Sequence, residues 1–155
     1  MELLEVKSIL FVCLGNICRS PIADGIAKEL IKIHSFDILI DSAGTGNYHI
    51  GEAPCERSQI VALKNGVDIS TLRARQINSR DKEIFDLVIA MDSSNYTNLK
   101  RVGFKNLFKL GDFGFDGLDV PDPYFFDGID GFDKVFDMID VGVKNIFNEI
   151  LKGKR

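Results

Sequence analysis

The fold is decided by residues 8–21, which read SILFVCLGNICRSP. Residues 8–12 form a short run that is apolar apart from Ser8. Such a run is typical of a strand buried in the middle of a sheet. A short loop follows, and then Ser20 and Pro21 predict a helix with a serine N-cap and a proline at its first helical position. A buried strand that leads directly into a helix predicts the first unit of a parallel α/β sheet.

The rest of the chain continues the alternation of strands and helices. Short apolar runs predict three more strands, at residues 37–42, 86–91 and 106–110. Helical spacing of apolar residues predicts further helices at residues 57–65 and 93–101 and from Asp130 onwards. The segment 111–130 is rich in Gly, Asp, Pro and Phe, and this composition predicts a long loop. We therefore expect one domain over residues 1–155, with a doubly wound, mostly parallel, four-stranded sheet flanked by helices.

Composition excludes several classes of protein. With 45% hydrophobic and 27% charged residues the chain is expected to fold around a core. Its formal net charge of −4 argues against a nucleic-acid partner, and no apolar run approaches the ~20 residues of a membrane span. The start at residues 1–5 has no basic region, and three cysteines do not make a secreted disulfide framework. We expect a cytoplasmic protein with neither a nucleic-acid nor a membrane partner, and the sequence assigns no oligomeric state.

The loop after the first strand is the candidate binding site, because ligands bind beyond the carboxyl ends of parallel strands. At a junction of strand and helix, several backbone N–H groups can surround one anion, here those of Leu14, Gly15, Asn16, Ile17 and Cys18. The glycine permits a tight curl, and asparagine tolerates a left-handed backbone.

Cys13 lies where the strand ends, and a thiolate there would be stabilised by the amides and by the helix dipole. The planar guanidinium of Arg19 suits two phosphate oxygens, and the Ser20 hydroxyl can donate to the sulfur. A thiolate beneath a bound oxyanion points to attack on phosphorus and a phosphocysteine intermediate.

Asp122 is the candidate proton donor for the departing oxygen. It stands between Pro121 and Pro123, which stiffen the loop and fix the direction of the carboxylate. The same group can then deprotonate the attacking water. Because Arg19 and the amides compensate the charge, the scheme requires no metal and no cofactor.

The other cysteines and the histidines have alternative interpretations. Cys18 is either a redox partner that forms a disulfide with Cys13 or a small buried residue, and both remain open. Cys55 is expected to be a surface or loop thiol. His34 and His49 have no spacing typical of a metal site.

Residues 11–21 closely resemble the signature of the low-molecular-weight protein tyrosine phosphatases. The likeness continues in chain order through residues 41–45, 74–76, 91–92 with 94–95, and 122–124. The resemblance implies a metal-independent phosphatase acting on protein phosphotyrosine, with Cys13 as nucleophile, Arg19 as phosphate clamp and Asp122 as general acid.

The resemblance also implies supporting residues. Asn16, Ser20 and Ser42 are expected to form a hydrogen-bond network that holds the loop, and Tyr48 and Tyr124 are expected to wall the substrate cleft.

Several positions depart from the pattern of this family or distinguish the chain from related families. Leu72 stands where many members carry a histidine that helps to hold the loop asparagine, and Phe125 stands where some carry a second tyrosine. Related arsenate reductases add two later cysteines, but none follows Cys55 in this chain. Arginine phosphatases tend to carry threonine in place of Ile17.

Asp92 matches a scaffold position of the family. The alternatives are a phosphate-binding module without turnover and an arsenate reductase-like redox enzyme.

Overall fold

Four parallel strands form a single sheet in the computed structural model, which describes residues 6–123 and 130–152. They are β1 (Ser8–Cys13), β2 (Leu39–Gly44), β3 (Leu87–Ala90) and β4 (Leu107–Lys109). Their order across the sheet is β2-β1-β3-β4, so β1 lies in the interior, as its apolar run predicts. The predicted parallel, four-stranded fold class is confirmed.

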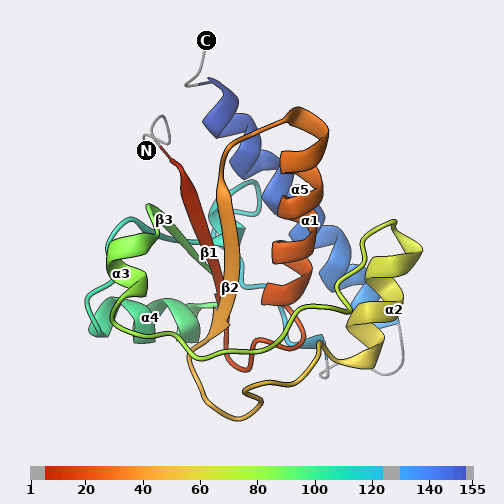
Figure 1. The fold of residues 1–155 in the computed structure, drawn as a ribbon, viewed down its shortest axis with the longest axis horizontal. Helices are drawn as coiled ribbons and strands as arrows, with labels where there is room; N and C mark the ends of the chain where they lie inside the picture. Colours follow the sequence, from red (N-terminus) through yellow and green to blue (C-terminus); the bar gives the residue numbers. More distant parts are fainter. Residues whose placement is uncertain (1–5, 124–129, 153–155) are drawn as a thin grey trace.

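Helices cover both faces of this sheet (Figure 1). On one face lie α1 (Ser20–His34), α2 (Glu56–Lys64) and α5 (Asp130–Lys152), and on the other lie α3 (Asp81–Ile84) and α4 (Ser93–Arg101). A short 3₁₀ turn, η1 (Leu110–Asp112), follows β4. In the part of the chain described, none of these helices combines the length and the apolar character that a membrane span requires.

The core has two halves because successive residues of β1 point to opposite faces of the sheet. Ile9 and Phe11 pack with apolar residues of α1 and α5, while Leu10 and Val12 pack with Leu99 of α4. Every residue of β1 is therefore buried, and the strand holds its carboxyl end rigidly at the edge of the sheet.

The predicted start of the first helix is wrong by one residue. Ser20 is the first residue of α1, and Arg19 holds the N-cap position without a side-chain cap. The Ser20 hydroxyl is instead engaged by Cys13 and Asn16, so its role is in the loop and not in the helix.

The carboxyl ends of β1 and β2 are in register, with Cys13 opposite Gly44. A Cβ atom on Gly44 would lie 2.7 Å from the carbonyl oxygen of Leu14, so glycine is needed where the loop after β1 crosses the end of β2. Asn16 adopts the predicted left-handed conformation, with φ of 59°.

Candidate active site

The sulfur of Cys13 lies at the buried end of β1, and the residue is only 2% exposed. The backbone N–H of Asn16 donates to this sulfur at 3.2 Å, and the Ser20 hydroxyl lies 3.1 Å from it. Because the Ser20 oxygen already accepts a bond from the Asn16 side chain, its own hydrogen is available to the sulfur. Two donors therefore meet at this sulfur, as a nucleophilic thiolate requires.

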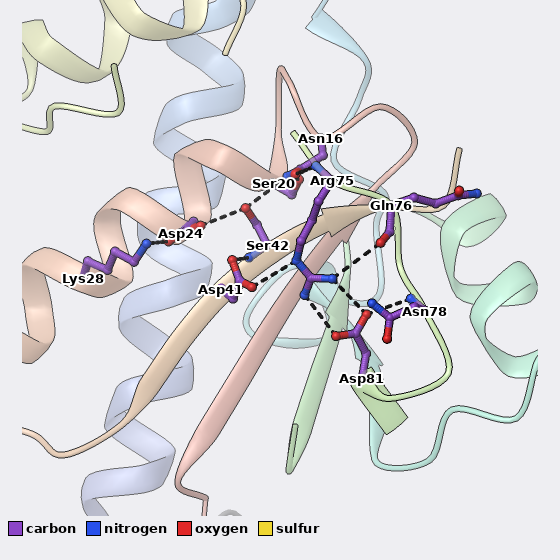
Figure 2. Close-up of polar contacts among 10 residues, drawn as sticks. All are labelled: Asn16, Ser20, Asp24, Lys28, Asp41, Ser42, Arg75, Gln76, Asn78 and Asp81. Carbon is purple, nitrogen blue, oxygen red and sulfur yellow. Dashed lines mark hydrogen bonds and ion pairs between the residues drawn. The ribbon is translucent and has the colours of Figure 1, made fainter. Parts of the chain in front are cut away.

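The side chain of Asn16 ties the loop to its surroundings (Figure 2). Its amide donates to Ser20 Oγ at 2.8 Å and to Ser42 Oγ at 3.0 Å, and its oxygen accepts from the backbone N–H of Arg75 at 3.1 Å. Both amide hydrogens are thus used without a histidine. Leu72, which replaces the histidine that the resemblance would suggest, packs against the core instead.

Behind Ser42 the network continues to a buried carboxylate. The Ser42 hydroxyl donates to Asp24 Oδ2 at 2.8 Å, and Lys28 Nζ lies 2.9 Å from Asp24 Oδ1 (Figure 2). Burial raises the pKa of Asp24, against the opposite influence of Lys28 and Ser42. A carboxyl group with only 1% exposure therefore underlies the loop.

Arg75 is the second anchor of the loop. Its guanidinium makes two bonds of 3.0 Å to Asp81 and one of 3.0 Å to Asp41 (Figure 2). Its backbone oxygen accepts from the N–H of Gly44 at 2.8 Å. Burial opposes the charge, but these carboxylates outweigh it and raise the pKa of Arg75. The segment that holds Asn16 is thereby fixed to the end of β2 and to the start of α3.

Four carbonyl groups of the loop accept hydrogen bonds from other segments of the chain. The oxygens of residues 13, 14, 17 and 18 accept from the N–H groups of Thr45, Gly46 and Cys55 and from the hydroxyl of Ser58. Because C=O and N–H point in opposite directions across a planar peptide, the N–H groups that follow these carbonyls point the other way. The loop can therefore present several donors to one anion.

Arg19 is buried beside the loop, with 6% exposure. Its Nη1 donates to Asp92 Oδ2 at 2.7 Å and to the carbonyl oxygen of Val120 at 3.0 Å. Burial disfavours its charge, but the neighbouring Cys13 and Asp92 more than offset this and raise the pKa of Arg19.

A cavity of about 140 Å³ opens above the sulfur. Cys13, Arg19 and Asp122 all line it, although the third lies more than a hundred residues along the chain from the other two. The remaining lining residues are Leu14, Gly15, Ile17, Cys18, Tyr48 and His49.

The cavity has a buried floor and an exposed rim. Leu14 is 48% and Tyr48 70% exposed, in contrast to the 2% of Cys13. Tyr124, the other predicted wall of the cleft, lies outside the described residues.

Three residues near the cavity have contacts that the sequence does not predict. His49 lines the cavity and pairs with Glu52 at 2.9 Å. Asp92 holds Arg19. Cys55, expected to be a loop thiol, lies with its sulfur 3.1 Å from that of Cys18. Only Asp92 carried a signal in the sequence, because it follows a predicted strand at the edge of the sheet where ligands bind.

Known proteins are similar to this chain along nearly its whole length. A model of the low molecular weight phosphotyrosine protein phosphatases matches residues 8–155. The low molecular weight protein-tyrosine-phosphatase YfkJ of Bacillus subtilis is 39% identical over 156 residues, which cover 96% of this chain and 98% of YfkJ.

Two solved structures show the same fold. A protein tyrosine phosphatase from Entamoeba histolytica, with Hepes in its active site, has a TM-score of 0.86 at 35% identity and covers 96% of this chain and 99% of its own. DARP, a Drosophila arginine phosphatase, has a TM-score of 0.83 at 30% identity and covers 90% of this chain and 95% of its own.

Proposed function

The chain belongs to the low molecular weight phosphotyrosine protein phosphatase family, and we propose that it hydrolyses protein phosphotyrosine and small aryl phosphates through a phosphocysteine intermediate. One observation carries the proposal: Cys13, Arg19 and Asp122 line one cavity, with the sulfur at its floor.

In the first step the Cys13 thiolate attacks phosphorus opposite the leaving oxygen. The S–P bond forms, the P–O bond to the aryl group breaks, and Asp122 gives its proton to the departing oxygen. Arg19 and the backbone N–H groups of the loop hold the other phosphate oxygens. Preorganised donors of this kind stabilise the charge that develops in the transition state.

In the second step water hydrolyses the phosphocysteine. The Asp122 carboxylate takes a proton from the water as its oxygen attacks phosphorus, and the P–S bond breaks. The sulfur leaves as a thiolate, which accepts hydrogen bonds from the N–H of Asn16 and the hydroxyl of Ser20. Inorganic phosphate is then released.

The cavity suits a flat aromatic ring. Its volume of about 140 Å³ is close to the roughly 150 Å³ of an apolar cavity that accepts a benzene molecule. Ile17, Leu14 and Tyr48 line it with apolar surface, the last two at the exposed rim. The ring of phosphotyrosine would occupy this volume, whereas the side chain of phosphoserine is too small to fill it. We therefore propose phosphotyrosine in proteins as the substrate class.

The thiols support a cellular location. None of the three cysteines forms a disulfide in the structure, and reduced thiols persist in a reducing compartment. We propose a cytoplasmic enzyme.

The test compares peptides of one sequence that carry phosphotyrosine, phosphoserine or phosphoarginine, each incubated with reduced protein. We expect release of phosphate from phosphotyrosine at least roughly a hundredfold faster than from phosphoserine, because only the ring fills the cavity. The phosphoarginine peptide probes the activity in the name of DARP. Preference for phosphoarginine would replace the proposed substrate, and binding of phosphopeptide without release would indicate a binding module.

Two variants separate the roles of the residues. Cys13→Ser should abolish turnover, which also excludes a contaminating phosphatase. Asp122→Asn should slow substrates with poor leaving groups far more than those with good ones. An equal effect on both kinds of substrate would show that Asp122 is not the acid.

A further inference from the structure

Two thiols touch beside the cavity. The sulfurs of Cys18 and Cys55 lie 3.1 Å apart, although 37 residues separate them in the chain, and both residues are partly buried. Two hydrogen bonds between the neighbouring segments hold them together. The N–H of Cys55 donates to the carbonyl of Ile17 at 2.9 Å, and the hydroxyl of Ser58 donates to the carbonyl of Cys18 at 2.9 Å. The contact is therefore built into the junction between the loop and the start of α2.

The hydrogen bonds around the pair have a definite order. Ser58 gives its only hydroxyl hydrogen to Cys18 O, so the Cys55 thiol, 3.0 Å away, donates to Ser58 Oγ. The Cys18 thiol then donates to the Cys55 sulfur. This bond to Cys55, together with burial and the negative charges of Cys13 and Asp122, raises the pKa of Cys18. Cys18 is held as a neutral thiol, which hydroperoxides attack poorly.

We propose that oxidation of this active site comes to rest as a disulfide between Cys18 and Cys55, which returns Cys13 as a free thiol. The inference rests on the proposed function in one respect only, that Cys13 is the reactive sulfur. The oxidant is a hydroperoxide.

The route has three balanced steps. The Cys13 thiolate attacks the hydroperoxide, so that an S–O bond forms, the O–O bond breaks and the departing oxygen takes up a proton. Cys18 then attacks the sulfenic acid, a Cys13–Cys18 bond forms, and hydroxide leaves with the Cys18 proton as water. Finally the partly exposed Cys55 loses its proton to solvent and attacks the Cys18 sulfur, and Cys13 leaves as a thiolate. In sum, two thiols become one disulfide and the hydroperoxide is reduced by two electrons.

The direction of the last step follows from the contacts of each sulfur. The best leaving group in thiol–disulfide exchange is the sulfur most stable as a thiolate. Cys13 receives donors from Asn16 and Ser20, whereas the Cys18 sulfur faces another sulfur. An S–S bond is about 2.05 Å long, so the sulfurs of Cys18 and Cys55 need to approach by only about 1 Å. Cys13 should therefore be the sulfur that is released.

The experiment maps disulfides after a limited dose of hydrogen peroxide. Free thiols are blocked by an alkylating reagent at acidic pH, the protein is digested without reductant, and the linked peptides are identified by mass. Wild type is compared with Cys55→Ser, which keeps a polar contact for Ser58 and should show wild-type activity before oxidation. Cys55→Ala serves as a second variant, and thermal unfolding verifies that both are folded.

In the wild type we expect a Cys18–Cys55 linkage, an alkylated Cys13, and activity that returns without added reductant. In both Cys55 variants we expect a Cys13–Cys18 linkage and loss of activity until dithiothreitol is added. A Cys13–Cys18 linkage that persists in the wild type as it does in the variants would overturn the inference. So would over-oxidation of Cys13 with Cys18 and Cys55 both alkylated.

The linkage readout does not depend on turnover. A protein that forms the Cys18–Cys55 linkage but releases no phosphate would refute the proposed function and leave the disulfide inference standing. In Cys13→Ser the Cys18–Cys55 disulfide should form at least about tenfold more slowly than in the wild type. The reason is that the oxidant then has to react with a neutral thiol first. An unchanged rate would contradict the route through Cys13.

Discussion

Asp92 holds Arg19 with one carboxylate oxygen and caps helix α4 with the other. Oδ2 accepts from the Arg19 guanidinium at 2.7 Å, and Oδ1 accepts from the N–H of Asn95 at 2.8 Å. The phosphate clamp proposed for the active site is thereby fixed to the N-terminus of a helix on the opposite face of the sheet from α1. One side chain thus contacts both the proposed phosphate clamp and a helix end, and its two contacts can be separated by mutation.

Asp92→Asn should reduce kcat/KM for 4-nitrophenyl phosphate by about tenfold, because the charge that orients Arg19 is lost. Asparagine is as good an N-cap as aspartate, so any fall in the free energy of unfolding of this variant reports the lost ion pair with the buried Arg19 and not the cap. Asp92→Ala should show the same kinetic loss and a further decrease of about 1 kcal/mol in the free energy of unfolding. Steady-state kinetics and urea unfolding measure the two effects. Identical stabilities of the two variants would contradict the capping role.

Asn16 combines a left-handed backbone with three side-chain hydrogen bonds. Asn16→Ala should lose the bonds and strain the backbone, whereas Asn16→Gly should lose the bonds alone. We expect both variants to lose most phosphatase activity, with the glycine variant about 1 kcal/mol more stable in urea unfolding. An alanine variant as stable as the glycine variant would contradict the strain argument.

Asp24 predicts a dependence of stability on pH. Its pKa is raised by burial above the ordinary value of 3.8, so the folded protein keeps this proton to higher pH than the unfolded chain does. Between the two pKa values the folded state binds more protons, and the free energy of unfolding falls as pH rises, by at most about 1.4 kcal/mol for each pH unit.

Asp24→Asn removes this titration and keeps an acceptor for Ser42. The stability of the variant relative to wild type should therefore increase as pH rises above about 4, and level off above the folded-state pKa. Urea unfolding across this range measures the difference. A difference that is constant with pH would rule out a raised pKa at Asp24.

The fold could be predicted because its determinants are local. The apolar run of β1 and the sequence from Ser93 to Arg101 each specify an element, and α4 has the predicted bounds. Ser20 shows the limit of local reasoning, because a serine before a proline has the pattern of an N-cap. Its hydroxyl belongs instead to the loop network, which depends on Cys13 and Asn16.

The missed parts of the site depend on contacts between distant segments. The short helix α3 is held by the ion pair of Asp81 with Arg75, and no periodic pattern marks it. Cys55 meets Cys18 only because the start of α2 docks on the loop. Spacing along the chain carries no information about such pairs, so the structure was needed to find them.

The proposed mechanism passes through a phosphocysteine at Cys13, and trapping this intermediate tests the mechanism. Asp122→Asn, which should slow the second step, is mixed with 4-nitrophenyl phosphate, quenched in acid within the first turnovers and digested. We expect one phosphoryl group on the peptide that contains Cys13, and none in the double variant that also carries Cys13→Ser. A phosphoryl group on another residue, or rapid turnover in the double variant, would contradict the mechanism.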